Sequence, residues 1–210
     1  KIVFVTNPNN PTGTWNTRNE LITFLKSVPA RVIVLLDEAY FEYVHEVDYP
    51  NGIELLGQYP NLVVTRTFSK AYGLASLRVG YGISSPELAD LMNRVRPPFN
   101  VDSFALAAAN ATLQDEAYVK ASISLNDEGM VYLTSEFERL GLGYIPSVGN
   151  FVSFKVPQGA DSLKVYADLL GKGVIVRPVA NYGKPEHLRV PIGTMAENRS
   201  FIEALEAVLL

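Results

Sequence analysis

The chain has 210 residues, of which 48% are hydrophobic and 19% charged, and its formal net charge is −4. This composition is typical of a globular protein, and the absence of a basic surplus argues against partners such as nucleic acid or an anionic membrane surface. There is no cysteine and there are only two histidines, His45 and His187, which excludes disulfides and thiol nucleophiles and argues against a metal site. No apolar run approaches the roughly 20 residues of a membrane helix, and no signal peptide is recognisable, so we expect a cytoplasmic protein.

The first part of the chain alternates short apolar runs with helical patterns. Four runs are rich in Val and Ile, as strands buried on both faces of a parallel sheet are: residues 2–5, 31–37, 61–67 and 79–83. A helix is predicted over residues 17–28, where Thr17 and Glu20 form a capping box. Another is predicted over residues 85–95, with Ser85 as N-cap and Pro86 at the first helical position. This alternation predicts an α/β fold with a mostly parallel sheet flanked by helices.

The pattern changes after residue 100. Residues 101–115 predict an Ala-rich, buried helix, and residues 117–143 predict a long helix that ends near Gly141. The remaining elements predict a small α+β domain: a strand at 149–156, a helix at 161–173, strands at 174–179 and 187–193, and a last helix with a capping box at 194–197. We therefore expect two domains, residues 1–125 and residues 126–210, joined through the long helix.

Polar side chains follow two of the predicted strands. Asp37 ends the buried run in "VIVLLDEAY", and Asn10 lies in the turn "NPNNPTGT" after the first strand. In open α/β sheets the carboxyl ends of the strands face the ligand crevice. Asp37 could there bind a cationic ring nitrogen or a ribose hydroxyl, and Asn10 could bind a ligand oxygen. Both residues fit a purely structural turn equally well, and these motifs alone do not decide between the alternatives.

The stretch "TRTFSKAYGLASLRVG" places Lys70 on a loop after the third strand. A lysine in such a position can form an imine with an aldehyde if its pKa is lowered by desolvation or a neighbouring cation. Hydroxyls and a guanidinium in the same stretch could hold a phosphate dianion: Thr67, Ser69 and Arg78. The alternative is a surface loop with stray charges, but residues 61–86 contain no acidic residue that could pair with either cation.

These groups together fit one cofactor, pyridoxal 5′-phosphate. Its aldehyde, phosphate, ring nitrogen and phenolic oxygen match a lysine, hydroxyls with an arginine, an aspartate, and an asparagine with a tyrosine. The motifs "NPNNPTGT", "DEAYFEY" and "TFSKAYGLASLRVGY", in this order, resemble the fold-type I aminotransferases of the aspartate aminotransferase superfamily. The segments "GNFVSF" and "GVIVRPVANYGKPEHLRVPIGT" resemble the histidinol-phosphate aminotransferase branch, and the resemblance covers essentially the whole chain.

The resemblance implies a role for each matching residue. Lys70 corresponds to the Schiff-base lysine that also shuttles a proton, and Asp37 to the partner of the pyridinium nitrogen. Other residues correspond to cofactor ligands: Asn10 and Tyr40 at the phenolic oxygen, and Thr67, Ser69 and Arg78 at the phosphate. The remaining residues correspond to the substrate pocket: Arg189 at the α-carboxylate, Arg177 at the substrate phosphate, and Asn150 and Tyr182 lining the site.

The resemblance also implies a reaction, the transfer of an amino group between histidinol phosphate or a related amino acid and 2-oxoglutarate, as in histidine biosynthesis by a homodimer. Several alternatives remain open. The same scaffold carries decarboxylases of phosphate-bearing amino acids, of the threonine-phosphate type, and transaminases of aromatic amino acids. The chain could also be a structural fragment without activity.

One departure from the family concerns the start of the chain. Lys1 leads directly into an apolar run without an initiator Met, so we expect the N-terminal half of the family to be missing. In the family that half carries a phosphate-binding turn, an aromatic residue that stacks on the cofactor, a tyrosine that reaches across the dimer and several strands. We therefore expect exposed apolar edges that favour association, weak cofactor binding and no activity of the isolated chain.

Overall fold

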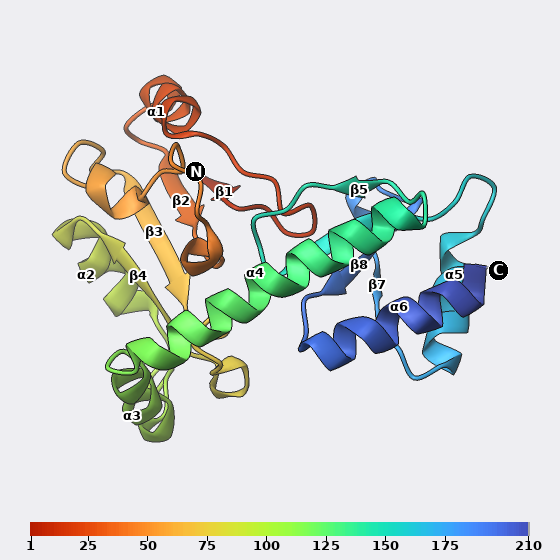
Figure 1. The fold of residues 1–210 in the computed structure, drawn as a ribbon. Coiled ribbons are helices and arrows are strands. Elements are labelled where there is room, and N and C mark those ends of the chain that lie inside the picture. Colours follow the sequence, from red (N-terminus) through yellow and green to blue (C-terminus); the bar gives the residue numbers. More distant parts are fainter. Residues whose placement is uncertain (210) are drawn as a thin grey trace. The chain divides into compact units, whose positions relative to one another are not determined.

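The computed structural model describes residues 1–209, and contacts within the chain divide it into two compact units. The first unit comprises residues 1–8 and 15–120, and the second comprises residues 9–14 and 121–210. Each unit contains its own four-stranded sheet (Figure 1). The helix α4 (Glu116–Arg139) belongs to both units, because the division falls between residues 120 and 121.

The sheet of the first unit has the strand order β1-β2-β3-β4. Its strands are β1 (Ile2–Thr6), β2 (Ile33–Asp37), β3 (Leu62–Thr67) and β4 (Gly80–Ser84). The first three run parallel and β4 runs antiparallel to β3. Three further helices belong to this unit: α1 (Arg18–Ser27), α2 (Pro86–Val95) and α3 (Ser103–Thr112). The parallel arrangement brings the carboxyl ends of β1, β2 and β3 to the same edge of the sheet.

Local sequence signals explain where the helices of this unit begin. Thr17 accepts a hydrogen bond from the Glu20 N–H, and the Glu20 carboxylate accepts one from the Thr17 N–H, so the predicted capping box is confirmed. Ser85 caps α2 by accepting a hydrogen bond from the Leu88 N–H, and Pro86 takes the first helical position. These caps satisfy backbone donors that the first helical turn leaves without partners.

The core of the first unit lies between α1 and the central strands. Leu21 and Leu25 of α1 pack in one buried cluster with apolar side chains from β2, β3 and the intervening loop: Val34, Leu36, Leu55, Leu62 and Val64. The strand residues of this cluster stand at alternating positions, so they lie on the face of the sheet that α1 covers.

Three elements are less buried than the sequence predicts. β4, predicted as a strand buried on both faces of a parallel sheet, is an antiparallel edge strand without a buried residue. Phe4 of β1 is 70% exposed and Ile2 is 55% exposed, because β1 is an edge strand that pairs only with β2. In α3 only Ala105 and Ala109 are buried, and Phe104 is 81% exposed. The prediction that these elements are buried was therefore wrong for the described chain, whereas the expected exposure of an apolar edge is observed.

The sheet of the second unit has the strand order β5-β6-β8-β7, and all its pairs are antiparallel. Its strands are β5 (Tyr144–Ile145), β6 (Phe151–Lys155), β7 (Arg177–Pro178) and β8 (His187–Pro191). The helices α5 (Ser162–Gly171) and α6 (Met195–Leu209) complete it. The predicted strand at 174–179 is reduced to two residues, and β5 was not predicted, since two-residue strands leave almost no pattern in a sequence.

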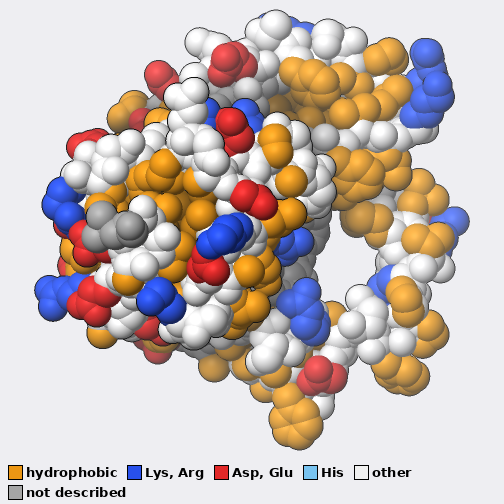
Figure 2. Space-filling view, turned by 90° about the vertical axis from the view of Figure 1, so that its right-hand side faces the viewer, with side chains coloured by type: hydrophobic (Ala, Val, Ile, Leu, Met, Phe, Trp, Pro, Cys, Tyr) orange, Lys and Arg blue, Asp and Glu red, His pale blue; other side chains and the backbone are white. Residues whose placement is uncertain are grey.

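An aromatic and aliphatic core holds the second unit together. The rings of Phe137 from α4 and Phe154 from β6 are stacked with centroids 5.0 Å apart, and Phe201 of α6 packs edge-on against Phe137. Leu188 and Leu205 are fully buried in the same cluster. On the surface, seen in Figure 2 from the side where Figure 1 labels α5 and α6, acidic and basic side chains are interspersed with hydrophobic ones.

The predicted fold class, α/β with a mostly parallel sheet and a small C-terminal α+β part, is confirmed. The predicted domain boundary between residues 125 and 126 stays a prediction. The contacts additionally assign residues 9–14 to the second unit, although they follow β1 in sequence. Among residues 1–209, no helix has the length and apolar character needed to cross a bilayer.

The segment 9–14 is held in the second unit by hydrogen bonds to its backbone carbonyls. The Ser153 hydroxyl donates to the Pro11 carbonyl at 2.7 Å, and the Val148 N–H donates to the Gly13 carbonyl at 3.0 Å. Gly13 has a φ of +74°, and a Cβ built there would lie 1.9 Å from the Ser147 Oγ. The backbone conformation and the close approach both require glycine at this position.

Replacing Gly13 by alanine is expected to lower the free energy of unfolding of the second unit by at least about 2 kcal/mol, from left-handed backbone strain and overpacking. Urea unfolding followed by circular dichroism measures the change. Gly171→Ala is the control, because a Cβ at Gly171 meets no atom within 4 Å and its φ is ordinary. Equal stability of the Gly13→Ala and Gly171→Ala variants would contradict the observed packing of this turn.

Candidate active site

The carboxyl ends of β2 and β3 bring several of the predicted site residues together. Asp37 is the last residue of β2 and lies opposite Thr65 of the parallel strand β3. Thr67 ends β3, and Ser69 and Lys70 follow in the next loop. The first unit therefore places a carboxylate, two hydroxyls and an amine at one edge of its sheet, where ligands of α/β proteins bind.

The Lys70 side chain is half-buried beside the ring of Tyr40. Its Nζ lies 5.4 Å from the ring centroid, within the range of a cation–π interaction. Tyr40 is itself only 4% exposed and directly precedes the 3-10 turn Phe41–Tyr43. The Lys70 carbonyl accepts a hydrogen bond from the Gly73 N–H at 2.9 Å, which closes a tight turn after the lysine. The backbone that carries this amine is thus fixed in a short turn.

Asp37 has one of the two roles that the sequence left open, that of a turn cap; its role toward a ligand stays a prediction. Its Oδ1 accepts a hydrogen bond from the Ala39 N–H at 3.0 Å, which is a turn cap. Burial raises the pKa of Asp37 above its usual value, whereas hydrogen bonds from Ala39 and Thr65 and the positive charge of Lys70 act in the opposite direction. A cation placed near this carboxylate would stabilise its ionised form further.

The predicted phosphate ligands lie on neighbouring segments. The Thr67 Oγ1 accepts a hydrogen bond from the Ser69 N–H at 3.0 Å, and the Phe68 N–H between them donates to the Val79 carbonyl. Arg78, the residue before Val79, is therefore next to this loop. Its side chain is exposed, donates to the Ala75 carbonyl at 2.7 Å, and its backbone is left-handed with a φ of 51°. Such a conformation is uncommon outside glycine and often marks a functional position.

The second unit brings another pair of predicted residues together. The Arg189 guanidinium on β8 donates through Nη1 to the Oδ1 of Asn10, which lies in the segment 9–14. Arg189 also lies 5.1 Å from the centre of the Phe151 ring. On the neighbouring strand β7, Arg177 is the cross-strand partner of Arg189. Two guanidinium groups side by side on one face of a sheet repel each other and favour a bound anion.

The structure gives only a backbone contact or a turn position for the two remaining predicted residues. Asn150 directly precedes β6, and its carbonyl accepts a hydrogen bond from the Ile192 N–H at 2.9 Å. Tyr182 ends the 3-10 turn Ala180–Tyr182 and is half exposed. The roles of both residues stay predictions. The structure thus forms one group around Lys70 in the first unit and one around Arg189 in the second.

Sequence reasoning missed a charged network next to this edge of the sheet. Glu38, directly after Asp37, is fully buried and paired with Arg66 of β3. Burial also raises the pKa of the neighbouring Glu42. An acid inside the apolar context of "LLDEAY" and the arginine within the strand "VVTRT" were signals that could have indicated this pair. No group of three or more His, Asp and Glu side chains suited to a metal ion occurs among residues 1–209.

Residues 1–205 match the family model described as aminotransferase class I and II. The chain belongs to this family. Among curated proteins it is 57% identical over 209 residues to the histidinol-phosphate aminotransferase 1 of Nitrosococcus oceani and 52% identical over 210 residues to the histidinol-phosphate aminotransferase 2 of Methylococcus capsulatus. Both alignments cover 100% of this chain and 56% of the relative, so the chain spans little more than half the length of these proteins.

Solved structures of similar fold include the histidinol-phosphate aminotransferase of Sinorhizobium meliloti in complex with pyridoxal-5′-phosphate. It has a TM-score of 0.90 and 31% identity, and the match covers 99% of this chain and 57% of that one. The L-threonine-O-3-phosphate decarboxylase of Porphyromonas gingivalis has a TM-score of 0.86 at 24% identity, covering 99% and 64%. The second similarity shows the fold alone.

Proposed function

We propose that this chain is the part of a pyridoxal-phosphate-dependent aminotransferase that carries the cofactor-bonding lysine, Lys70, and that the whole enzyme transfers an amino group between histidinol phosphate or a related amino acid and 2-oxoglutarate. The observation that carries the proposal is the position of Lys70 beside Asp37 at the strand ends. This occurs in a chain that matches histidinol-phosphate aminotransferases along its whole length.

The residues of the first unit fit the groups of the cofactor. When bound, pyridoxal phosphate supplies an aldehyde that bonds to an amine and a cationic ring that accepts negative charge from the substrate Cα. Asp37 would hold the ring-nitrogen proton, since a cation beside a half-buried carboxylate favours its ionised form. Thr67, Ser69 and Arg78 would bind the phosphate, and the Tyr40 hydroxyl would donate to the phenolic oxygen.

Lys70 would have two tasks. Its Nζ would hold the cofactor at its aldehyde, and as a free neutral amine it would take the proton from the substrate Cα as a general base. The turn that Gly73 closes fixes the backbone from which the amine would act in the second task. The proton transfer requires a neutral amine at a fixed position, so the chemistry depends on the position of Lys70 more than on its charge.

The two arginines of the second unit would recognise the substrate. The Arg189 guanidinium, oriented by Asn10 and Phe151, would bind the α-carboxylate with two parallel hydrogen bonds. Asn10 would in addition donate its amide N–H to the phenolic oxygen of the cofactor. Arg177, the exposed cross-strand neighbour, would bind the phosphate of histidinol phosphate. Asn150 and Tyr182 would line the pocket.

Product analysis of the full-length protein tests this proposal. With histidinol phosphate and 2-oxoglutarate, we expect glutamate to form in proportion to the amino donor consumed, without release of carbon dioxide. Release of carbon dioxide from threonine phosphate, without glutamate, would instead indicate a decarboxylase on this fold. Transfer from aromatic amino acids alone would restrict the proposal to a different substrate class.

Replacing Arg177 by glutamine tests the assignment of the substrate phosphate. We expect KM for histidinol phosphate to rise at least about tenfold, because a charge-assisted hydrogen bond contributes about 1.5–3 kcal/mol. The KM for 2-oxoglutarate, which has no phosphate, should change much less. Arg199→Gln, an exposed arginine of α6, serves as the control. Equal effects on both substrates would contradict a specific contact with phosphate.

We further propose that the enzyme is a homodimer in the cytoplasm, as the family resemblance implies. Analytical ultracentrifugation of the full-length protein should give twice the mass of one chain. Cell fractionation should recover the protein with cytoplasmic markers, and a monomeric or membrane-bound protein would contradict this part of the proposal.

A further inference from the structure

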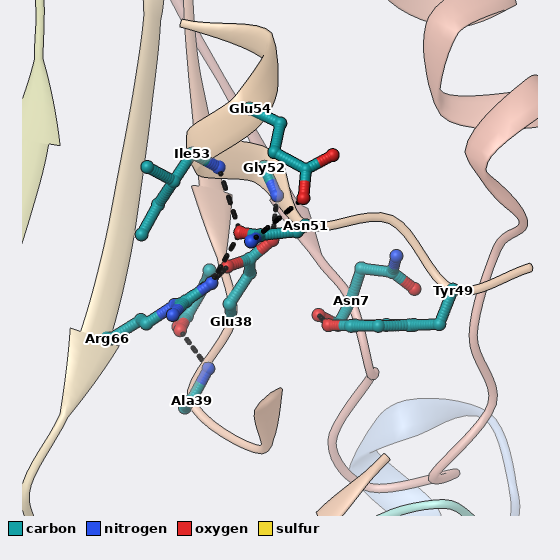
Figure 3. Close-up of polar contacts among 10 residues, drawn as sticks. Asn7, Glu38, Ala39, Tyr49, Asn51, Gly52, Ile53, Glu54 and Arg66 are labelled. Atoms are coloured by element: carbon teal, nitrogen blue, oxygen red, sulfur yellow. Dashed lines mark hydrogen bonds and ion pairs between the residues drawn. The ribbon is translucent and has the colours of Figure 1, made fainter. Parts of the chain in front are cut away.

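An ion pair between the fully buried Glu38 and the largely buried Arg66 lies next to the candidate cofactor site. The Glu38 carboxylate accepts hydrogen bonds from Arg66 through Nε at 2.9 Å and Nη2 at 2.8 Å, and from the Gly52 N–H at 2.7 Å. Glu38 is 0% exposed, and the Arg66 side chain is 10% exposed. Figure 3 shows the two side chains directed towards each other between the strands. The carboxylate is therefore well satisfied, as a buried charge must be.

Arg66 also fixes the segment that follows β2. Its guanidinium carbon lies 3.4 Å from the centre of the Phe41 ring, and its Nη2 donates to the Asn51 Oδ1 at 2.8 Å. Asn51 in turn caps the 3-10 turn Gly52–Leu55 (Figure 3). One guanidinium thus connects β3 with three positions of the loop after β2, and it is held by contacts on its edge and its face.

Glu38 and Arg66 are each adjacent in sequence to residues of the candidate site. Glu38 follows Asp37, and Arg66 lies between Thr65 and Thr67. Because side chains alternate along a strand, Arg66 points to the opposite face of the sheet from Thr65 and Thr67. The pair thus connects β2 and β3 on one face of the sheet, and Asp37 lies on the opposite face with Thr65, its partner in the strand register.

The surroundings of the pair contain further titratable groups. Glu42 lies on the turn after β2, and Tyr49, Tyr72 and Tyr81 lie on other segments of the first unit. Burial raises the pKa of Glu42 and of each of these tyrosines, and the positive charge of Arg66 opposes the rise in all four. A buried ion pair is weak evidence for stability, because apolar residues of similar volume often stabilise as well. The position of the Glu38–Arg66 pair beside the candidate site indicates a role other than stability.

We propose that Glu38 and Arg66 are positioning residues, which hold the ends of β2 and β3 at the separation that brings Asp37 and Lys70 into electrostatic contact. The use of this contact in catalysis rests on the function proposed above. The positioning itself is a property of the first unit and can be measured without cofactor.

The test measures the influence of Lys70 on Asp37 directly. Carbon-13 NMR of the Asp37 carboxyl gives its pKa in the full-length protein without cofactor and in its Lys70→Ala variant, and the difference between the two is the Asp37–Lys70 coupling. We compare this coupling with Arg66 intact and with Arg66→Lys, which keeps the positive charge but cannot donate to Glu38 from two nitrogens as Arg66 does. If Arg66→Lys does not fold, Glu38→Gln, which keeps the shape of the side chain, replaces it.

We expect the coupling to fall to less than about half in Arg66→Lys, because the interaction of charges weakens as their separation grows. The Asp37–Lys70 coupling should stay unchanged in two control variants. Val34→Ala destabilises the core of the same sheet without touching the pair, and Arg94→Lys alters the exposed pair Arg94–Asp90 of α2. An unchanged coupling in Arg66→Lys, or an equal loss in Val34→Ala, would overturn the proposal.

The same variants separate this inference from the proposed function. If the wild-type protein does not bond pyridoxal phosphate through Lys70, the proposed function fails, but the coupling measured without cofactor still decides the positioning role. If the bond forms and the coupling does not depend on Arg66, only the positioning role fails.

Discussion

Replacing Lys70 by arginine is expected to abolish amino-group transfer although the charge is kept. Arginine stays protonated at all accessible pH values, so it can neither bond to an aldehyde nor take a proton from the substrate. The loss of general-base catalysis alone lowers the rate by about 10²–10⁴-fold, and the loss of the covalent bond adds to it. A coupled assay for glutamate formation in the full-length protein measures the effect.

The fold should tolerate this substitution, since Lys70 lies on a half-buried turn outside the core clusters. Lys26→Arg, on the exposed last turn of α1, is the matched control and should retain full activity. Substantial turnover by Lys70→Arg, or an equal loss in Lys26→Arg, would contradict the role assigned to Lys70.

Replacing Asp37 by asparagine is expected to lower catalysis and to raise stability at neutral pH. Asparagine can still accept the hydrogen bond from the Ala39 N–H, but it cannot hold a proton on a ring nitrogen by its charge. Removing one preorganised electrostatic contact typically costs about 10²–10³-fold in kcat. A fall in kcat of this size without a fall in the free energy of unfolding would show that Asp37 acts in catalysis and not only as a turn cap.

The stability change follows from the raised pKa of Asp37, which burial causes. Between its ordinary value of about 3.9 and its folded value, the native state binds more protons than the unfolded state, so stability falls as pH rises. Above the folded pKa the cost of the buried charge is fully present. Asp37→Asn removes it, and since solvent reaches part of the carboxylate, the gain should stay below about 1 kcal/mol.

Urea unfolding at a series of pH values checks this prediction. The stability difference between wild type and Asp37→Asn should be largest near neutral pH and should vanish as pH falls towards the ordinary carboxyl range. Asp48→Asn, an exposed residue, should leave catalysis unchanged. A variant that is less stable than wild type at neutral pH would indicate that the Asp37 charge stabilises the fold.

Much of the fold could be predicted because the deciding signals are local. The apolar runs of β2 and β3 and the capping boxes at Thr17 and Thr194 involve residues within a few positions of each other. The exposure of β1 could not be predicted in this way. A strand buried on both faces and an edge strand have the same apolar sequence, and only the neighbouring strands distinguish them.

The candidate site shows the same difference between features that local sequence signals predict and features that depend on distant residues. Asp37 and Lys70 could be assigned to one edge because both follow strands of a parallel sheet, and this geometry is general. The contact between Asn10 and Arg189 joins residues 179 positions apart, and it depends on the segment 9–14 packing with the second unit. The Glu38–Arg66 pair depends on the register of β2 and β3. Neither contact leaves a periodic signal in the sequence.

The most direct test of the central claim, that Lys70 holds the cofactor, is the mass of a single peptide. The full-length protein is incubated with pyridoxal phosphate, reduced with borohydride to convert the imine to a stable secondary amine, digested and mapped. We predict that the reduced cofactor is attached to the peptide that contains Lys70 and that the label is absent from Lys70→Ala. Attachment to another lysine, or an unchanged label in Lys70→Ala, would contradict the account.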